Sequence, residues 1–128
     1  MTRLHVLHVD DEPDIREVAA MSLELDETMS LTSAASGAEA LALLEAGCRP
    51  DVILLDVMMP ELDGPGTLAR LRRLPGHETT PVIFMTARAQ SSELSRYIAL
   101  GAVGVIVKPF DPMSLAAAVR DTLAGAGG

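Results

Sequence analysis

Five short runs of apolar, mostly β-branched residues alternate with longer segments, and this alternation constrains the fold of the chain more than any other feature. In the intervening segments apolar side chains recur three or four residues apart, which is the period of a helix packed on one face. Strands separated by helices form a parallel sheet, and strands that are apolar throughout need helices on both sides. We therefore predict an α/β fold, a doubly wound parallel sheet. The runs are 4–9, 29–34, 52–55, 82–85 and 103–107.

Residues at the expected ends of the helices agree with this order. Ser36, followed three residues later by Glu39, is a capping-box pair at a helix start. Gly47 and Gly101 stand where helices are expected to end. The stripe predicted to face the sheet in the first helix consists of Ile15, Val18, Ser22 and Leu25.

Length and composition narrow the class of protein. The 128 residues fit one domain, which we place at 1–123, followed by a flexible tail at 124–128. A net charge of −8 argues against duplex DNA or an anionic membrane as the main partner, and 2% aromatic residues argue against a base-stacking platform. The chain has one cysteine and no apolar run long enough to span a membrane, so we expect a cytoplasmic protein.

Polar residues follow four of the five apolar runs at the point where each run ends. Asp10 and Asp11 come after the first run, Asp56 after the third, Thr86 after the fourth and Lys108 after the fifth. Lys108 is also the only lysine of the chain. Because the carboxyl ends of parallel strands meet at one edge of an open sheet, where ligands bind, these side chains are expected to form the functional site.

The chemistry of this set points to a divalent cation and a phosphoryl group. Two carboxylates about 4 Å apart repel each other by roughly 4 kcal/mol at an effective dielectric near 20, so Asp10, Asp11 and Asp56 need positive charge between them. Mg²⁺ suits oxygen ligands of this kind, and Lys108 supplies a second cation. A carboxylate can act as a nucleophile toward phosphorus, and Thr86 could hold a phosphoryl oxygen through its hydroxyl.

Four short motifs occur in order along nearly the whole chain. They are Val-Asp-Asp-Glu-Pro at 9–13, Leu-Leu-Asp-Val-Met-Met-Pro at 54–60 with Asp-Gly at 63–64, Met-Thr-Ala at 85–87, and Lys-Pro-Phe at 108–110. In these residues the chain resembles the receiver domain of two-component response regulators, typified by the chemotaxis response regulator.

The resemblance implies a flavodoxin-like fold of five strands, in the order 2-1-3-4-5, flanked by five helices. It implies that Asp56 accepts a phosphoryl group from a phosphohistidine of a partner kinase. Mg²⁺ would be held by Asp10, Asp11, Asp56 and the backbone carbonyl of Met58. Lys108 would pair with the phosphoryl oxygens, and its bond to the following proline is expected to be cis.

One position departs from the family pattern. Thr86 is expected to move toward the phosphoryl group, and members of the family usually carry Tyr or Phe three positions before the lysine, where this chain has Val105. A β-branched side chain cannot make the corresponding ring rotation. We therefore expect output to depend on a shifted surface in residues 87–100, with Tyr97 as a candidate contact.

Met58 and Arg88 each stand two residues beyond a predicted site residue. Both are expected near the place where water would attack the phosphoryl group. A bulky methionine and a long cation there would shield it and slow hydrolysis.

The histidines and the arginine cluster have plainer interpretations. His5 and His8 cannot chelate a metal together, because residues three apart on a strand point to opposite faces. His8 is expected to be a hydrogen-bonded core residue, and His77, in a Pro-Gly loop, is expected to be solvated. Arg70, Arg72 and Arg73 are expected to form a solvated helix face.

The leading hypothesis is thus a signalling switch that catalyses its own phosphoryl transfer and slow hydrolysis, rather than an enzyme with a separate substrate. Its partners would be a histidine kinase or phosphotransfer protein and a downstream protein target or effector domain; a homodimer is left open. A haloacid dehalogenase-type phosphohydrolase would need an acid at Met58, and a flavin module would need a hydroxyl- and glycine-rich loop after the first strand. A scaffold that is never phosphorylated is a further alternative.

Overall fold

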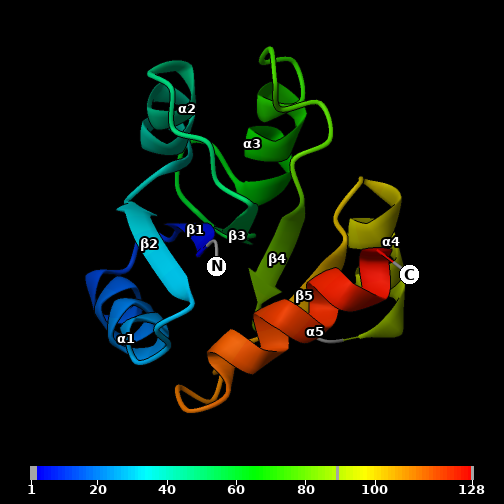
Figure 1. Ribbon diagram of the computed structural model, residues 1–128. Helices are drawn as coiled ribbons and strands as arrows, with labels where there is room; N and C mark the ends of the chain where they lie inside the picture. Colours follow the sequence, from blue (N-terminus) through cyan, green and yellow to red (C-terminus); the bar gives the residue numbers. More distant parts are fainter. Residues whose placement is uncertain (1–2, 89, 128) are drawn as a thin grey trace.

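A computed structural model describes residues 3–88 and 90–127, which form a single five-stranded parallel sheet with helices on both faces (Figure 1). The strand order is β2-β1-β3-β4-β5, as the resemblance implied. Each strand begins and ends within a residue of the predicted apolar run. The strands are β1 (Leu4–Val9), β2 (Met29–Ala34), β3 (Val52–Asp56), β4 (Val82–Thr86) and β5 (Gly104–Val107).

The five helices divide into two layers, which the sheet separates (Figure 1). Side chains of α1 and α5 pack in one buried cluster, and side chains of α2, α3 and α4 pack in the other. The doubly wound α/β fold predicted from the alternation is therefore confirmed. The helices are α1 (Pro13–Glu24), α2 (Gly37–Glu45), α3 (Gly64–Leu71), α4 (Ser91–Ala99) and α5 (Leu115–Gly127).

The two faces of β1 supply both layers. Val6 belongs to the α1/α5 cluster, whereas Leu7 and Val9 belong to the α2/α3/α4 cluster. Because successive side chains of a strand alternate between faces, His8 and Asp10 point to the same side as Val6. A polar pair therefore continues the apolar row that lies beneath α1 and α5.

Local capping accounts for several helix boundaries. The Ser36 hydroxyl accepts a hydrogen bond from the Glu39 backbone N–H at 3.0 Å, as predicted for a capping residue. Gly47 and Gly101 follow α2 and α4 with φ of 108° and 113°, a backbone conformation that glycine adopts without steric cost. The predicted helix ends at these two positions are confirmed.

The predicted packing stripe of α1 is wrong in part. Ser22 is buried, but its buried companions are Ala19 and Leu23, whereas Val18 is 38% exposed and Leu25 is 72% exposed. The buried face is centred on Ala19, and at about 100° per residue Val18 and Leu25 both lie about 100–120° around the helix from it, on the flank that faces solvent.

The last helix, α5, continues to Gly127, and Gly128 lies outside the described residues. The division into a domain at 1–123 and a flexible tail at 124–128 stays a prediction. None of the helices in the described part of the chain is both long enough and apolar enough to cross a membrane.

Candidate functional site

Acidic side chains and the single lysine meet at the carboxyl end of the sheet, as predicted. Asp10 follows β1, Asp56 is the last residue of β3, and Lys108 follows β5. One carboxylate oxygen from each of Asp10, Asp11 and Asp56 lies within 4.8 Å of the others. Three strand ends and the residue after Asp10 thus place three carboxylates and one ammonium in a single cluster.

Asp10 is fixed from several directions and is fully buried. Its Oδ1 accepts the Glu12 backbone N–H at 2.9 Å, and its Oδ2 accepts the Lys108 ammonium at 2.8 Å. The Arg16 guanidinium of α1 donates to the Asp10 carbonyl oxygen at 2.8 Å. Nothing in the sequence separates Arg16 from a surface arginine, so sequence reasoning missed this support.

Asp56 shares the lysine with Asp10. The Lys108 Nζ lies 3.2 Å from Asp56 Oδ1, and the Asp56 residue is 4% exposed. Burial, reinforced by the negative charge of Asp10, raises the pKa of Asp56 to about 6, although Lys108 and a Met58 backbone hydrogen bond oppose that shift. Burial alone would lower the pKa of Lys108, but the hydrogen bond and charges of Asp10 and Asp56 raise it above the usual value.

The donor set fits a hard divalent cation. All three clustered groups offer carboxylate oxygens, and one ammonium neutralises a single charge among three. Oxygen ligands with remaining negative charge are what Mg²⁺ selects, in contrast to the nitrogen and sulfur ligands of zinc. The Met58 carbonyl, the fourth predicted ligand, stays a prediction; the Met58 residue itself is 73% exposed.

The loop after β3 leaves no space for a side chain at the start of α3. The Gly64 N–H donates to the Val57 carbonyl at 2.9 Å. A Cβ placed on Gly64 would lie 2.6 Å from the Asp56 carbonyl oxygen, closer than any real contact of that kind. The first residue of α3 therefore presses directly on the strand end that carries Asp56.

Thr86 ends β4 beside this cluster, since the strand register pairs the preceding residue, Met85, with Asp56. The Thr86 side chain is buried, and its hydroxyl accepts the Arg88 backbone N–H at 3.1 Å. It faces a cavity of about 280 Å³ that Met58, Arg88 and Tyr97 also line. The structure therefore brings both predicted flanking residues, Met58 and Arg88, next to Thr86.

Tyr97 is a core residue of α4 rather than an exposed contact. It is 4% exposed and packs edge-on against Phe84 of β4, with ring centroids 5.2 Å apart. Val105 packs against the same buried cluster. The ring of Tyr97 thus lies between the cavity beside Thr86 and the core, on the side of the sheet where Val105 replaces the usual aromatic residue.

The profile of the response regulator receiver domain matches residues 6–120. This chain belongs to that family. The match covers β1 from Val6 onward, the other four strands and the whole acidic cluster, so this chain is a receiver domain of two-component signal transduction. The Lys108–Pro109 peptide bond is cis, as the resemblance implied.

Two curated relatives of similar identity differ in how much of their own length this chain covers. A Leptolyngbya boryana protein described as an uncharacterized 14.6 kDa protein in the sodA1 3′ region is 38% identical over 115 residues, which are 90% of this chain and 86% of that protein. The transcriptional regulatory protein CseB of Streptomyces avermitilis is 40% identical over 119 residues, which are 93% of this chain but 48% of CseB. The receiver therefore spans about half the length of CseB.

Among solved structures, the chemotaxis response regulator CheY4 of Vibrio cholerae superposes with a TM-score of 0.85 at 33% sequence identity. The superposition covers 94% of this receiver and 99% of the CheY4 chain. It agrees with the strand order and the two helical layers of the fold.

His8 differs from the prediction of a hydrogen-bonded core histidine. Its residue is fully buried, yet neither ring nitrogen has a hydrogen-bond partner among the described residues. Burial lowers the pKa of His8 to about 4, with Asp10 opposing that shift and the charges of Lys108 and Arg16 adding to it. The prediction of a hydrogen-bonded ring was wrong because the sequence pattern indicates that His8 is buried but does not indicate which groups lie next to its ring nitrogens.

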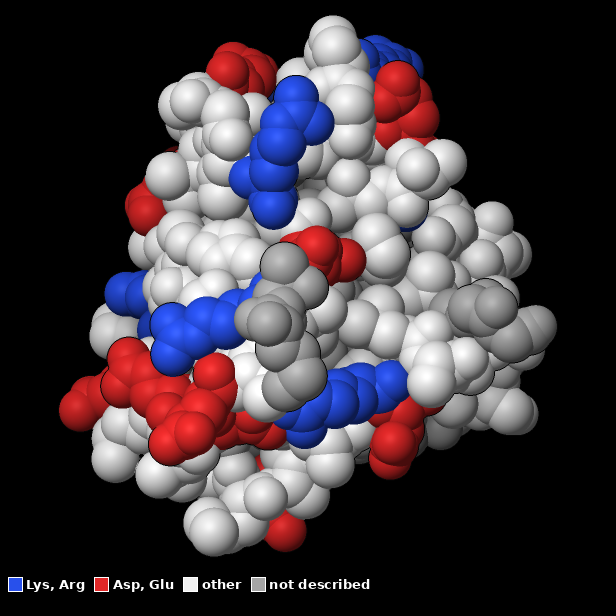
Figure 2. All heavy atoms as spheres, viewed as in Figure 1, with Lys and Arg blue, Asp and Glu red and all other residues white. Residues whose placement is uncertain are grey.

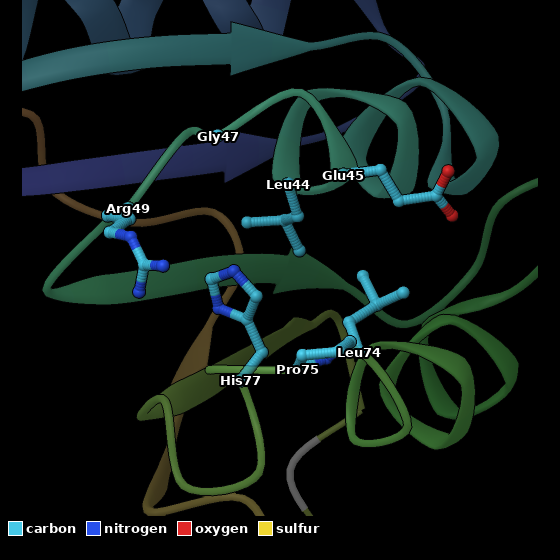
Figure 3. Close-up of a pocket in the computed structure, with 7 residues that line it drawn as sticks. All are labelled: Leu44, Glu45, Gly47, Arg49, Leu74, Pro75 and His77. Carbon is cyan, nitrogen blue, oxygen red and sulfur yellow. The ribbon is translucent and has the colours of Figure 1, made fainter.

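A second correction concerns the opposite end of the sheet, where a pocket of about 270 Å³ lies between the end of α2 and the loops before β3 and β4 (Figure 3). His77 points into it and is 4% exposed rather than solvated, with Nδ1 paired to the Thr80 hydroxyl at 3.0 Å. Arg72 is half-buried and donates to the carbonyls of His77 and Thr80, at 3.1 and 2.6 Å. Of the predicted solvated arginines, Arg70 and Arg73 are exposed.

The charged surface is mixed in sign where it can be viewed. On the face shown in Figure 2, acidic and basic side chains lie interspersed among uncharged ones. On this face the basic side chains do not gather into one broad patch.

Proposed function

We propose that this receiver accepts a phosphoryl group on Asp56 from the phosphohistidine of a histidine kinase or phosphotransfer protein, in a reaction that requires Mg²⁺. The observation that carries the proposal is the shared lysine: one ammonium lies 2.8 Å from Asp10 and 3.2 Å from Asp56 at the end of the sheet. A buried carboxylate is suited to receive a phosphoryl group when a neighbouring ammonium can turn to neutralise the charge of that group.

The nucleophile in this proposal is the ionised carboxylate of Asp56. One of its oxygens attacks phosphorus, the P–N bond to the donor imidazole breaks, and the bonding electrons leave with that ring. With a pKa of about 6, Asp56 is largely ionised at neutral pH and keeps the basicity of a good nucleophile. Hydrolysis later returns the carboxylate and inorganic phosphate.

The remaining residues bind and neutralise charge. Lys108, which donates to Asp10, would turn to an oxygen of the phosphoryl group, and the Thr86 hydroxyl, which accepts the Arg88 N–H, would donate its own O–H to another oxygen. Asp10, Asp11, Asp56 and the Met58 carbonyl would hold Mg²⁺, which supplies electrostatic stabilisation of the transferred group.

The signal in this proposal leaves through residues 87–100. Movement of Thr86 would displace the Arg88 backbone, whose N–H the Thr86 hydroxyl accepts. It would also change the shape of the cavity that Thr86 and Tyr97 line. Ile98 and Leu100, at the far end of α4, are 50% and 46% exposed and would present the changed surface to a protein target. If structures with and without the phosphoryl group were identical in this segment, this part of the proposal would fail.

The proposal is tested by incubating the protein with acetyl phosphate and Mg²⁺ and recording the intact mass. The wild type should gain one phosphoryl group, and Asp56→Asn should gain none. Asp121→Asn, which changes an exposed aspartate of α5, is the matched control and should behave as the wild type. EDTA should prevent the mass change. An adduct that survives in Asp56→Asn would overturn the assignment.

A further inference from the structure

His8 is the buried polar side chain whose presence the proposed phosphoryl transfer does not explain. Its ring is fully buried and its two nitrogens lack partners in the described part of the chain. It shares a face of β1 with Asp10, and its Nε2 lies 4.0 Å from Asp10 Oδ2. That distance is too long for a hydrogen bond but is closed by a shift of about 1 Å.

The His8 ring is buried on the face of β1 that also carries Val6 of the apolar cluster beneath α1 and α5. An imidazole can carry an N–H on either ring nitrogen, and the partner that each nitrogen meets decides which one holds it. Because Nε2 faces a carboxylate oxygen, the proton is favoured on Nε2, which makes His8 a potential donor to Asp10.

The oxygen that His8 faces has one donor that can leave. Asp10 Oδ2 accepts the Lys108 ammonium, whereas Oδ1 accepts a backbone N–H that belongs to the same turn. When Lys108 moves to a phosphoryl oxygen, Oδ2 stays buried and loses its donor. A buried carboxylate oxygen without a donor is unfavourable, and His8 is the donor within reach.

We propose that His8 is a positioning residue: its Nε2–H binds Asp10 Oδ2 when Lys108 turns to the phosphoryl group, and so keeps Asp10 oriented toward the metal ion. This inference rests on the proposed function, because it requires both Mg²⁺ and the movement of Lys108. Outer partners that orient metal-binding side chains are a general feature of metal sites. A histidine that only filled space would form no such bond.

The first experiment observes the ring itself. In ¹⁵N-labelled protein, imidazole nitrogen shifts are recorded without metal, with Mg²⁺, and with Mg²⁺ and beryllofluoride, a stable mimic of the phosphoryl group. His8 should hold its proton on Nε2, and that nitrogen should shift toward a hydrogen-bonded donor when beryllofluoride is added. His5, paired with Ser30 and Thr32, and His77, paired with Thr80, are internal controls that should not shift.

The second experiment separates the donor from the volume of the ring. His8→Gln keeps an N–H donor at similar reach, and His8→Met fills the same space without one. Calorimetric titration with Mg²⁺ in the presence of beryllofluoride should show binding about tenfold weaker in His8→Met, and most of the affinity should return in His8→Gln. Thermal unfolding checks that both variants are folded.

The outcomes distinguish this inference from the proposed function. If the wild type binds neither Mg²⁺ nor beryllofluoride, both are overturned. If the wild type binds both ligands, while His8→Met binds as tightly and the His8 nitrogens do not move, the positioning role is overturned and the phosphoacceptor proposal stands. Weaker binding in His8→Met with recovery in His8→Gln supports the positioning role.

Discussion

Two buried histidines lie near opposite ends of the same sheet, and they differ in the hydrogen bonds of their rings. His77, at the amino end, has its ring paired with Thr80 and its carbonyl held by Arg72. His8, near the carboxyl end, has no partner among the described residues and lies 4.0 Å from a buried carboxylate. The first histidine is fixed by the fold, and the second is left available.

The same difference extends to the charged groups of the two ends. At the amino end, the Arg72 guanidinium donates hydrogen bonds to two uncharged carbonyl oxygens. At the carboxyl end one ammonium is divided between Asp10 and Asp56. Buried polar groups that are fully paired stabilise a fold, whereas groups that share too few partners can change partners when a ligand arrives. The following predictions test this contrast, from the largest expected effect to the smallest.

Lys108→Met should have the largest effect on stability. The change leaves Asp10 and Asp56 without their cation, and removal of one partner from a buried pair costs about 3–5 kcal/mol. Urea unfolding at pH 8 in EDTA measures the loss. A variant as stable as the wild type in EDTA would mean that Lys108 does not hold this end of the sheet together.

Arg72→Met should destabilise the amino end without reaching the other. It leaves buried carbonyl oxygens without a charged donor, which costs about 2–3 kcal/mol. Arg73→Met, at the exposed neighbouring position, is the matched control and should change stability by less than about 0.5 kcal/mol. Mg²⁺ should not rescue Arg72→Met. Rescue by the metal would show that the two ends are coupled.

Asp56→Asn should stabilise the metal-free protein above pH 6. The pKa of Asp56 is about 6 in the folded state and near 3.8 when unfolded, so its ionisation disfavours folding as pH rises through that interval. The expected gain in unfolding free energy is about 1–3 kcal/mol at pH 8, and it should vanish near pH 4. Urea unfolding of both proteins across this pH range measures it; a gain that does not depend on pH would rule out ionisation of Asp56 as its cause.

Met58→Asn should alter kinetics rather than stability. The exposed Met58 side chain lines the cavity beside Thr86, and a smaller polar residue would admit and orient water there. Dephosphorylation should accelerate about three- to tenfold, which corresponds to about 0.7–1.4 kcal/mol of activation free energy. Loss of the phosphoryl mass with time measures the rate, and Met113→Asn, at another exposed methionine, serves as control. An unchanged rate would count against shielding by Met58.

The sequence was sufficient to predict the sheet and the residues at its carboxyl end. The alternation of apolar runs with segments of helical period predicts the sheet, and the residues directly after each run lie at its carboxyl end. Each apolar run ends within one residue of the end of its strand, so Asp10, Asp56 and Lys108 could be assigned to one edge before any contact was known. The burial of loop residues could not be predicted in this way. Arg72 and Arg73 are adjacent and identical in type, and only the path of the loop before β4 decides which of them meets carbonyl oxygens.

The hydrogen-bond partners of buried side chains also could not be predicted from the hydrophobic pattern. The alternation along β1 predicts that His8 is inside, but it says nothing about what the ring nitrogens meet across the helical layer. Likewise the apolar stripe of α1 could not show that the buried face is centred on Ala19, which leaves Val18 and Leu25 exposed. Hydrogen-bond pairing and the orientation of a helix on the sheet depend on tertiary contacts, which a one-dimensional repeat does not contain.

The single lysine has a practical consequence. The other nine of the ten lysine and arginine side chains are arginines, so an amine-directed acylating reagent meets only Lys108 and the α-amino group of the chain. The Lys108 side chain is 14% exposed and its ammonium is held by two carboxylates, which should suppress acylation. The extent of acylation at Lys108, followed by peptide mass spectrometry, would therefore report how strongly the site holds the lysine ammonium with and without Mg²⁺ or a phosphoryl group.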